Sequence, residues 1–428
     1  MTRYGFYALV TVLLLATPSI CHAQAEETAS TATTSSETPS IWERDRLMDG
    51  WFDCRDQASD KGLDVNLTVI NVYQQNFHGG LSTHRKAGRY SGYYNLELMV
   101  DFDKLKFIPG GSVYALAGGS WSEGIDGPSV GSLSNVNGGA RGYRSIDLLE
   151  LWYQQRLLDD RIRIRAGKID LTGGPGDGSS HPMWFDTNAY ANCEKTQFLN
   201  GALVINPLIP FPEQGLGTVL YISPVDEVYV LLGVADSQAD RRTTGFASAF
   251  KHDTRVIAMA EVGVTPKFDS PNGPMPGGYR VGMWYDPQPK LTFAGDVKRN
   301  DVGLYANFDQ MIFKENDDKN DKQGLGVFGR FGLADGDVSP TRQFYSAGLS
   351  YQGLIPTRDN DVIGIGIASG CLNRDFGFDR RRETALELFY NVQITPWLML
   401  TPGLQHITHA GGENRDALVG GLRLQVVF

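Results

Sequence analysis

The chain has little cysteine, no excess of positive charge and no long apolar run beyond its first residues. It contains only 4 Cys in 428 residues, so it is not a small scaffold held together by disulfides. No segment after the N-terminal leader approaches the roughly 18 consecutive apolar residues that a transmembrane helix needs. Acidic residues outnumber basic ones by 49 to 39, and a net charge of −10 argues against a dedicated nucleic-acid binder.

What the chain does contain is apolar and aromatic side chains together with abundant glycine. Hydrophobic residues make up 41% and aromatic residues 11%, which excludes a chain that is disordered throughout. The 50 Gly are about 12% of the chain, against a usual ~7%, and they follow no collagen-like period. The mean hydropathy of −0.25 is that of a typical soluble protein, so the average composition alone argues against a membrane protein.

The N-terminus has the layout of a secretory signal peptide. Arg3 is followed by an apolar run centred on Leu9–Leu15, and the stretch ends in the small residue Ala23. We therefore expect residues 1–23 to be removed on export, and the Ser- and Thr-rich residues 24–40 to form a disordered leader. A capping-box spacing at Ser40 and near-helical spacing of apolar residues then predict a short amphipathic helix over about 41–57.

Export leaves three cysteines, Cys54, Cys193 and Cys371, of which two can form one disulfide in an oxidising compartment. Which pair forms is open. The scatter of Cys and His gives no metal-ligand spacing, and no catalytic residues, metal or cofactor are predicted.

From about residue 64 onward the chain alternates between apolar and polar residues again and again. Such period-2 segments predict strands, and they number roughly sixteen to eighteen. They are separated by clusters of Gly, Pro, Asn and Asp, which favour turns, and not by helical patterns, so the strands are antiparallel. Clear examples are the segments 95–102, 161–166, 363–368, 386–391 and 422–428.

The end of the chain distinguishes a membrane barrel from a soluble β protein. The sequence stops inside an apolar strand at Phe428, with Leu424 and Val426 on one face of that strand. A ragged apolar terminus frays in a soluble domain, whereas in a closed barrel it pairs with the first strand. We therefore predict an all-β fold, a transmembrane antiparallel β-barrel over residues 64–428. Lipid-facing and water-facing residues alternate in such a barrel, so their hydropathies cancel in the average.

Several segments, taken in order, resemble the carbohydrate-selective porin family typified by a glucose-selective porin B. The resemblance extends over nearly the whole mature chain. It is carried by residues 98–111 (LMVDFDKLKFIPGG), 146–170 (IDLLELWYQQRLLDDRIRIRAGKID), 200–217 (NGALVINPLIPFPEQGLG), 307–313 (NFDQMIF), 348–364 (GLSYQGLIPTRDNDVIG) and 383–405 (ETALELFYNVQITPWLMLTPGLQ).

The resemblance implies a sixteen-stranded outer-membrane barrel of a Gram-negative bacterium, with an N-terminal helical segment (41–63) near the periplasmic mouth. It also implies a passive porin, not an enzyme, that admits monosaccharides such as glucose. The expected partners are small sugars, outer-membrane lipid and lipopolysaccharide, and the barrel-assembly machinery, which would recognise Leu424, Val426 and Phe428; no nucleic acid is expected. The chain would be a monomer or a homotrimer. Residues 119–143 and 181–196 depart from the family pattern, so the preferred sugar stays open.

A passive sugar pore needs hydrogen-bonding groups that replace the hydration of the sugar and still release it. Strand parity places alternate residues of the segments 146–157 and 161–170 in the lumen, provided that no bulge shifts the parity. The predicted constriction consists of Glu97, Asp101, Glu150, Trp152, Arg163, Arg165 and Lys168. A plainer interpretation is that these charges only solvate a wide lumen wall.

The sequence leaves open two alternatives to a carbohydrate-selective porin. The alternation of Arg161, Arg163 and Arg165 favours an anion- or phosphate-selective pore, or a general porin. The second alternative is an exported soluble β-rich protein that binds carbohydrate or acts as an enzyme.

Overall fold

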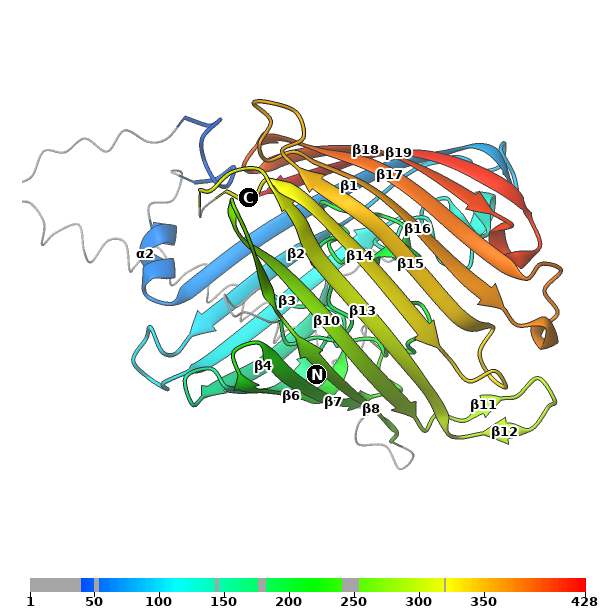
Figure 1. Ribbon diagram of the computed structural model, residues 1–428, viewed down its shortest axis with the longest axis horizontal. Helices are drawn as coiled ribbons and strands as arrows, with labels where there is room; N and C mark the ends of the chain where they lie inside the picture. The colour runs from blue at the N-terminus through cyan, green and yellow to red at the C-terminus, as the bar shows by residue number, and fades with distance from the viewer. Residues whose placement is uncertain (1–39, 50–53, 143–145, 176–181, 241–253, 319–320) are drawn as a thin grey trace, which may run out of the picture.

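The repeated alternation of the sequence becomes the wall of a closed β-barrel (Figure 1). The computed structural model describes residues 40–49, 54–142, 146–175, 182–240, 254–318 and 321–428. Within these residues the main sheet has 17 strands, all antiparallel, and one of them, β9 (Lys267–Ser270), pairs only with the start of β10. The other sixteen form the wall, which confirms the predicted fold.

The wall strands follow one another around the barrel in chain order. They are β1 (Leu63–Gly80), β2 (Gly88–Asp101), β3 (Gly111–Trp121), β4 (Asp147–Leu157), β5 (Ile162–Ile169), β6 (Gly215–Val225), β7 (Val228–Asp236), β8 (Val256–Val264), β10 (Gly273–Asp286), β13 (Asp301–Lys314), β14 (Gly324–Leu333), β15 (Thr341–Gln352), β16 (Val362–Leu372), β17 (Arg382–Thr395), β18 (Leu398–Thr408) and β19 (Arg415–Val427).

The barrel closes between its first and last strands, as the apolar C-terminus predicts. β1 pairs with β19 in a register that runs from Thr68 opposite Val427 to Gly80 opposite Arg415. The backbone N–H of Phe428 donates to the carbonyl of Leu67 at 2.8 Å. Because every wall strand has a neighbour on both sides, the wall leaves no open sheet edge in contact with lipid.

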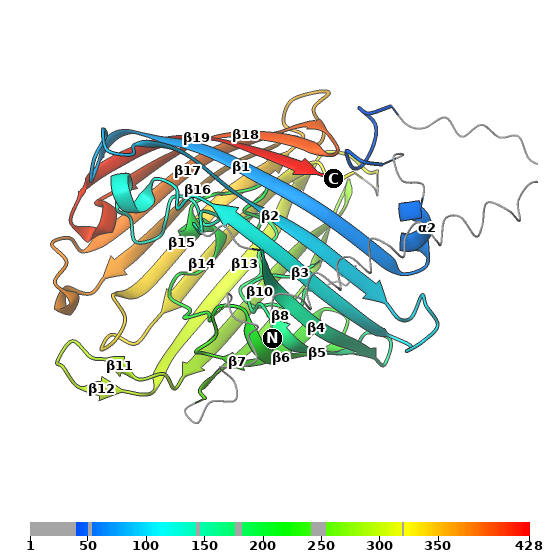
Figure 2. The ribbon, with the colours of Figure 1, turned by 180° about the vertical axis from the view of Figure 1, so that it is seen from behind.

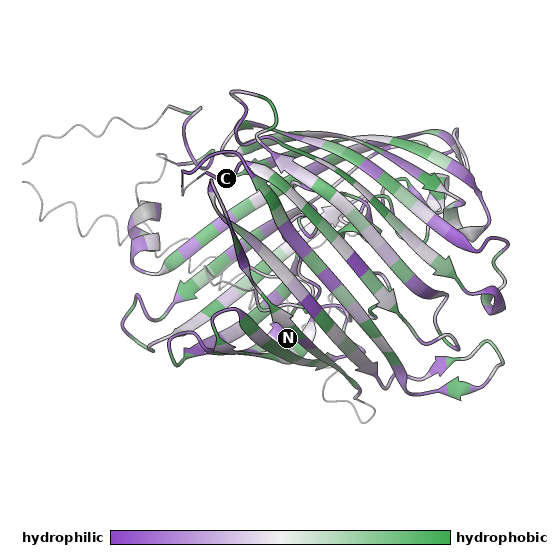
Figure 3. Cartoon of the chain, in the orientation of Figure 1, coloured by the Kyte–Doolittle hydropathy of each residue, from purple (hydrophilic) through white to green (hydrophobic). Residues whose placement is uncertain are grey.

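Hydrophobic and hydrophilic residues alternate along the wall strands (Figure 3), and successive side chains of a strand face opposite sides of the wall. On β17, Leu386 and Leu388 point outward and are 41% and 44% exposed, whereas Glu387 and Phe389 point inward and are buried. The outer face is therefore apolar and the inner face largely polar, which reconciles a negative mean hydropathy with a membrane protein. A soluble protein would leave this belt of aliphatic side chains facing water, and that alternative is set aside.

The two ends of the barrel differ in the length of their connections (Figures 1 and 2). At the end where β1 begins and β19 stops, the turns are short, such as 158–161, 226–227 and 396–397. At the other end the connections include 122–146, 170–214 and 237–255. Short turns and both chain ends are typical of the periplasmic side and long loops of the external side.

The helical elements are short. They are α2 (Cys54–Asp60), α3 (Gly201–Val204), the π-helix η1 (Asp126–Val130), and the 3-10 helices η3 (Arg374–Phe376) and η4 (Ala410–Gly412); a small hairpin joins β11 (Lys290–Leu291) to β12 (Val297–Lys298). In the described part of the chain, no helix has the length and apolarity to cross a membrane.

The helix predicted over about 41–57 is wrong over residues 41–49, which form turns at the periplasmic end. Backbone groups there bond to the barrel instead of to a neighbouring helical turn. The N–H of Leu47 donates to Val427 at 2.9 Å, and the indole of Trp397 donates to the carbonyl of Ile41 at 2.7 Å. The predicted signal peptide and nearly all of the leader (residues 1–39) lie outside the described residues, as does the side chain of Cys54, while Cys193 and Cys371 are free.

Candidate pore constriction

The described parts of the connection between β5 and β6, residues 170–175 and 182–214, fold back into the barrel and cross its lumen. Phe198 from this connection packs edge-to-face against Phe328 of β14 and Phe389 of β17, at ring-centroid distances of 5.6 and 4.9 Å. The carboxylate of Glu387 accepts the backbone N–H groups of Leu199 and Asn200, each at 2.8 Å. The connection is therefore attached to the wall opposite the strands from which it starts. We call residues 170–175 and 182–214 the inward loop.

Buried arginines of the wall bind backbone carbonyls of the inward loop. Arg330 of β14 donates to Leu203 at 2.6 Å and to Val204 at 3.2 Å. Arg423 of β19 donates to Glu194 and Gln197, both at 2.8 Å. Each guanidinium presents several fixed donors, so one side chain satisfies two carbonyls that would otherwise be buried without partners.

An ion pair without solvent exposure joins the loop to the wall. Asp186 of the loop and Arg330 have side chains that are both 0% exposed, and their Oδ2 and Nε atoms are 3.2 Å apart. Asp186 also accepts the side-chain amide of Asn307 at 2.6 Å and the backbone N–H of Asn206 at 2.9 Å. A buried charge needs this degree of satisfaction, because its desolvation costs several kcal/mol. The inward loop is thus held in one position.

A second connection, residues 122–142 between β3 and β4, covers the lumen side of β1 and β17–β19. Its Ile125, Val130 and Val136 form one apolar cluster with wall residues such as Ile407 and Ala417. The carbonyl of Val136 accepts two wall amides, from Gln74 and Gln405, each at 2.9 Å. The free part of the lumen is therefore displaced toward β2–β10.

Among the described residues, two cavities lie in that part of the lumen. The external cavity, of about 480 Å³, lies against β2–β4 and the inward loop, and Glu97, Tyr114 and Lys195 are among the residues that line it. The periplasmic cavity, of about 1030 Å³, lies against β5, β6 and β10, and is lined by Arg163, Tyr221 and Asp309 among others. Both cavities share four lining residues, all from the inward loop: Trp184, Asn188, Ala189 and Asn192.

The shared residues combine an aromatic ring with amides. Trp184 is half-buried and stands between Met183 and Phe185, which are buried in the loop's apolar core. The amide of Asn188 is taken up by the wall, since it donates to Asn307 at 2.8 Å and to the carbonyl of Phe308 at 3.0 Å. Asn188 therefore fixes the backbone at this point. The amide of Asn192 donates to the carbonyl of Val204 at 2.7 Å, and Trp184 borders both cavities.

The structure places the seven predicted constriction residues in three groups. Glu97 and Glu150 line the external cavity, and Arg163 lines the periplasmic one, where its guanidinium lies 3.9 Å from the ring centroid of Tyr221. Glu97 and Lys195 approach to 3.9 Å across the external cavity.

Trp152 and Arg165 point inward but are buried in the wall, and Lys168, which stands opposite the exposed Leu151, is buried near the end of β5. Arg165 stacks over Trp152 at 3.9 Å and donates twice to Gln154, at 3.1 and 2.9 Å, and Lys168 donates to the carbonyl of Leu148 at 2.7 Å. Asp101 ends β2, where its carboxylate accepts the N–H groups of the turn at Asp103 and Lys104. The inward loop covers the side chains of Trp152 and Arg165.

Comparison with known proteins gives one consistent result. A family model described as "Carbohydrate-selective porin, OprB family" matches residues 85–428. Porin B of Pseudomonas aeruginosa is 25% identical over 433 residues, with 89% of this chain and 91% of that protein covered. The putative porin QuiX of Acinetobacter baylyi is 24% identical over 435 residues, which cover 91% of this chain and 94% of that protein.

A solved structure has the same fold. OprB of Pseudomonas putida, in its high-pH structure, superposes with a TM-score of 0.78 at 21% sequence identity, and covers 91% of this chain and 100% of that chain. At this level of identity the likeness concerns the arrangement of strands.

Proposed function

The chain belongs to the carbohydrate-selective porin family, OprB, and from this membership we propose a path for the sugar along the two cavities, past Trp184 and Asn192. Proteins of this family and fold are channels, and the chain is a passive carbohydrate-selective porin of the outer membrane. The observation that carries the path is the set of lining residues that the external and periplasmic cavities share.

The shared residues suit a neutral sugar of monosaccharide size. An indole face accepts the apolar C–H face of a pyranose, and an amide exchanges hydrogen bonds with hydroxyl groups. Both contacts are modest, so a sugar bound at Trp184 and Asn192 leaves again, as passive transport requires. A hexose such as glucose is the substrate we propose.

Glucose is expected to reduce the ion current through the reconstituted channel. In a planar bilayer the single-channel conductance falls as glucose is added, because a bound sugar occupies the point where the two cavities meet. A sugar alcohol of similar size is the matched control for viscosity and osmotic effects. If glucose and every other hexose leave the current at the level of the control, the path past Trp184 is wrong.

The second candidate, an anion-selective pore, rests on the arginines around the periplasmic cavity. The described lining of that cavity contains four basic residues, Arg161, Arg163, Lys267 and Arg280, and five acidic ones, Asp159, Asp160, Asp226, Glu227 and Asp309. Arg280 is paired with Asp309 at 2.8 Å, and Arg161 with Asp226 at 3.4 Å. The described lining of the external cavity has two basic residues, Arg141 and Lys195, and four acidic ones, Glu97, Glu150, Asp170 and Glu194.

These charges predict weak cation selectivity. In a tenfold gradient of potassium chloride we expect a small reversal potential with the sign of potassium permeation, and a gradient of neutral sugar serves as the osmotic control. A large reversal potential with the sign of chloride, together with no effect of sugar, would favour the anion pore.

A further inference from the structure

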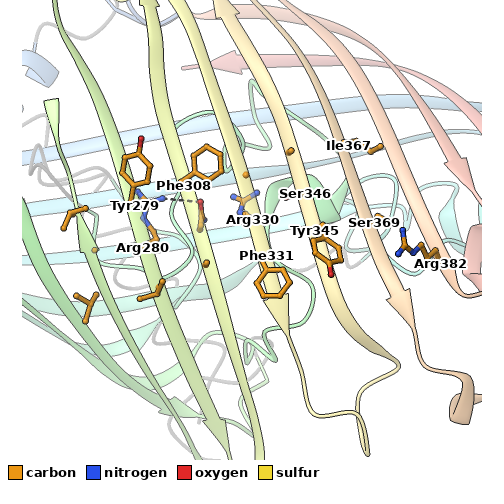
Figure 4. A pocket seen from close by; sticks show the side chains of 18 residues that line it. Tyr279, Arg280, Phe308, Arg330, Phe331, Tyr345, Ser346, Ile367, Ser369 and Arg382 are labelled. Carbon is orange, nitrogen blue, oxygen red and sulfur yellow. Dashed lines mark hydrogen bonds between the residues drawn. The ribbon is translucent and has the colours of Figure 1, made fainter. Parts of the chain in front are cut away.

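The outer wall carries a long apolar concavity that the transport path does not use (Figure 4). It has a volume of about 900 Å³ and extends across β8, β10 and β13–β16 to the first residue of β17. Most of its lining consists of outward-facing side chains such as Val262, Val281 and Ile367, which are 47%, 60% and 48% exposed. We call this concavity the wall groove.

Small residues form the floor of the wall groove and aromatic residues form its sides. Ala306, Gly329 and Ala347 stand on three consecutive strands, and a Cβ atom at Gly329 would lie 2.5 Å from the ring of Phe308. Tyr279 stacks on Phe308 at a centroid distance of 6.1 Å, and Phe331 packs on Tyr345 at 5.3 Å. The ring of Phe308 therefore lies over Gly329, and the aromatic side chains border a shallow concavity in which Ala306 is half-buried and Ala347 is exposed.

Strand register shows where the wall groove leads. Val281 pairs with Ala306, Ala306 with Phe331, and Phe331 with Tyr345. Tyr345 in turn pairs with Ser369, which lies two positions before Cys371, the partner of Arg382. Because barrel strands are tilted, this row crosses the membrane belt diagonally and ends at the external rim. Figure 4 shows Arg382 at that end, beside Ser369.

The external end of the wall groove is strongly basic. Arg380, Arg381 and Arg382 are consecutive and exposed, and among the described residues none of the three has an ion-pair partner within 4.0 Å. Glu383, the next residue, faces the lumen, where it accepts the N–H groups of Leu133 and Gly411. The whole chain has a net charge of −10, so this cluster of three arginines is a local concentration of positive charge.

The loop that carries these arginines is held in place by neighbouring strands and loops. The side-chain amide of Asn373 donates to Gly336 at 2.6 Å, and Arg342 pairs with Asp375 at 2.7 Å. The N–H of Arg380 donates to Gly412 at 3.0 Å, and that of Leu372 to the carbonyl of Arg381 at 2.9 Å. The backbone of Arg380–Arg382 is thus fixed relative to the wall groove before any ligand binds.

We propose that the wall groove binds a phosphorylated lipid of the outer leaflet, with the chemistry of lipid A. Its acyl chains lie along Ala306, Phe308 and Ala347, and one of its phosphates pairs with Arg382. Guanidinium groups bind phosphate through two parallel hydrogen bonds, and basic clusters beside a membrane-spanning wall recognise anionic lipid headgroups. Because the positive charge lies at one end of the wall groove alone, it fixes the orientation of the lipid.

A second concavity on the same wall provides an internal control. It has a volume of about 460 Å³, lies across β6–β8 and β10, and is lined by Leu220, Ala260 and Met283 among others, with no charged side chain in its described lining. We expect it to be filled by any acyl chain, without preference for a headgroup.

The test is native mass spectrometry of the full chain in detergent micelles with bis-phosphorylated lipid A. The unmodified chain is expected to retain one lipid, and R382Q to weaken its binding about tenfold through loss of the charged hydrogen bonds. A347F, which fills the floor, is expected to weaken binding to a similar extent. A260F, in the uncharged concavity, is expected to leave it unchanged. Folding of each variant is checked by its heat-dependent gel mobility.

Three results would overturn the proposal. The first is equal binding by R382Q, A347F and the unmodified chain. The second is equal binding of lipid A from which both phosphates have been removed, which would mean unspecific apolar contact. The third is displacement of the lipid by millimolar inorganic phosphate, which would mean a site for the free anion. The inference does not depend on the proposed sugar path, and glucose block is expected to be the same in R382Q.

Discussion

Replacing Arg330 with methionine is expected to widen the channel, with a conductance severalfold above that of the unmodified protein and no block by glucose. Arg330 is wholly buried and joins Asp186 and two carbonyls of the inward loop to β14. Methionine fills a similar volume but leaves Asp186 as a buried charge with only two amide donors. Removal of one partner of a buried pair costs about 3–5 kcal/mol, so the loop is expected to leave its position.

This loss is larger than that of a single neutral hydrogen bond, which contributes about 1 kcal/mol. R156M is the matched control, because Arg156 pairs with Asp103 at 3.8 Å near the periplasmic turns and does not contact the inward loop. The double variant R330M/D186N removes the unpaired charge and is expected to recover part of the block. A conductance of R330M equal to that of the unmodified protein, in a chain with normal heat-dependent mobility, would show that the other contacts suffice to hold the loop.

The architecture of the wall could be predicted from local patterns. Alternation predicts which residues face lipid, and the apolar C-terminus predicts the pairing of β19 with β1, because both depend on neighbours in one strand or on the need for closure. The inward orientation of Glu150, Trp152, Arg163 and Arg165 also follows from strand parity.

Burial stops alternating at the external end of β5. Lys168 and Ile169 are both buried although they are consecutive, while the pairing of β5 with β4 and β6 continues without a register shift. Between these residues and Arg165, Gly167 has a φ of +143°, and a side chain there would lie 2.4 Å from the carbonyl oxygen of Leu151, which explains why glycine stands at this position. The sequence contains the glycine but no sign that distinguishes it from the other 49.

The residues of the constriction could not be identified from the sequence for a different reason. Side chains that face the lumen contact sugar only where the inward loop leaves them uncovered, and its position depends on partners far away in the chain, such as Glu387 and Arg423. The segments that depart from the family pattern, 119–143 and 181–196, are largely those that fold into the lumen. The connection between β5 and β6 is long and rich in apolar residues, which was the available signal that it is buried inside the barrel.

The arginines inside the barrel have a different role from the anion binding that their pattern in the sequence suggests. The alternation of Arg161, Arg163 and Arg165 favours a ladder of anion sites. Arg161 and Arg163 both line the periplasmic cavity, but Arg161 is paired with Asp226 at its rim, and Arg165 is stacked on Trp152. The buried arginines Arg280, Arg330 and Arg423 instead hold the inward loop. Much of the charge inside this barrel therefore shapes the lumen, which agrees with the proposed path of the sugar past Trp184 and Asn192.

Replacing Trp184 with alanine is expected to remove most of the affinity for sugar while leaving an open and stable channel. The indole borders both cavities, whereas its neighbours Met183 and Phe185 anchor the backbone in the apolar core. Loss of the ring removes an apolar surface for the sugar that is worth about 1–1.5 kcal/mol, so the glucose concentration for half-maximal block is expected to rise about tenfold.

W121A is the matched control, because Trp121 stacks on the exposed Tyr90 at the end of β3 and lines neither cavity. The comparison with Arg330 separates two roles of lumen residues. R330M is expected to raise the conductance and abolish block together, since the loop moves, whereas W184A is expected to change the conductance only slightly. If W184A needs no more glucose for half-maximal block than W121A does, the sugar does not contact this ring, and its path must follow the opposite side of the inward loop.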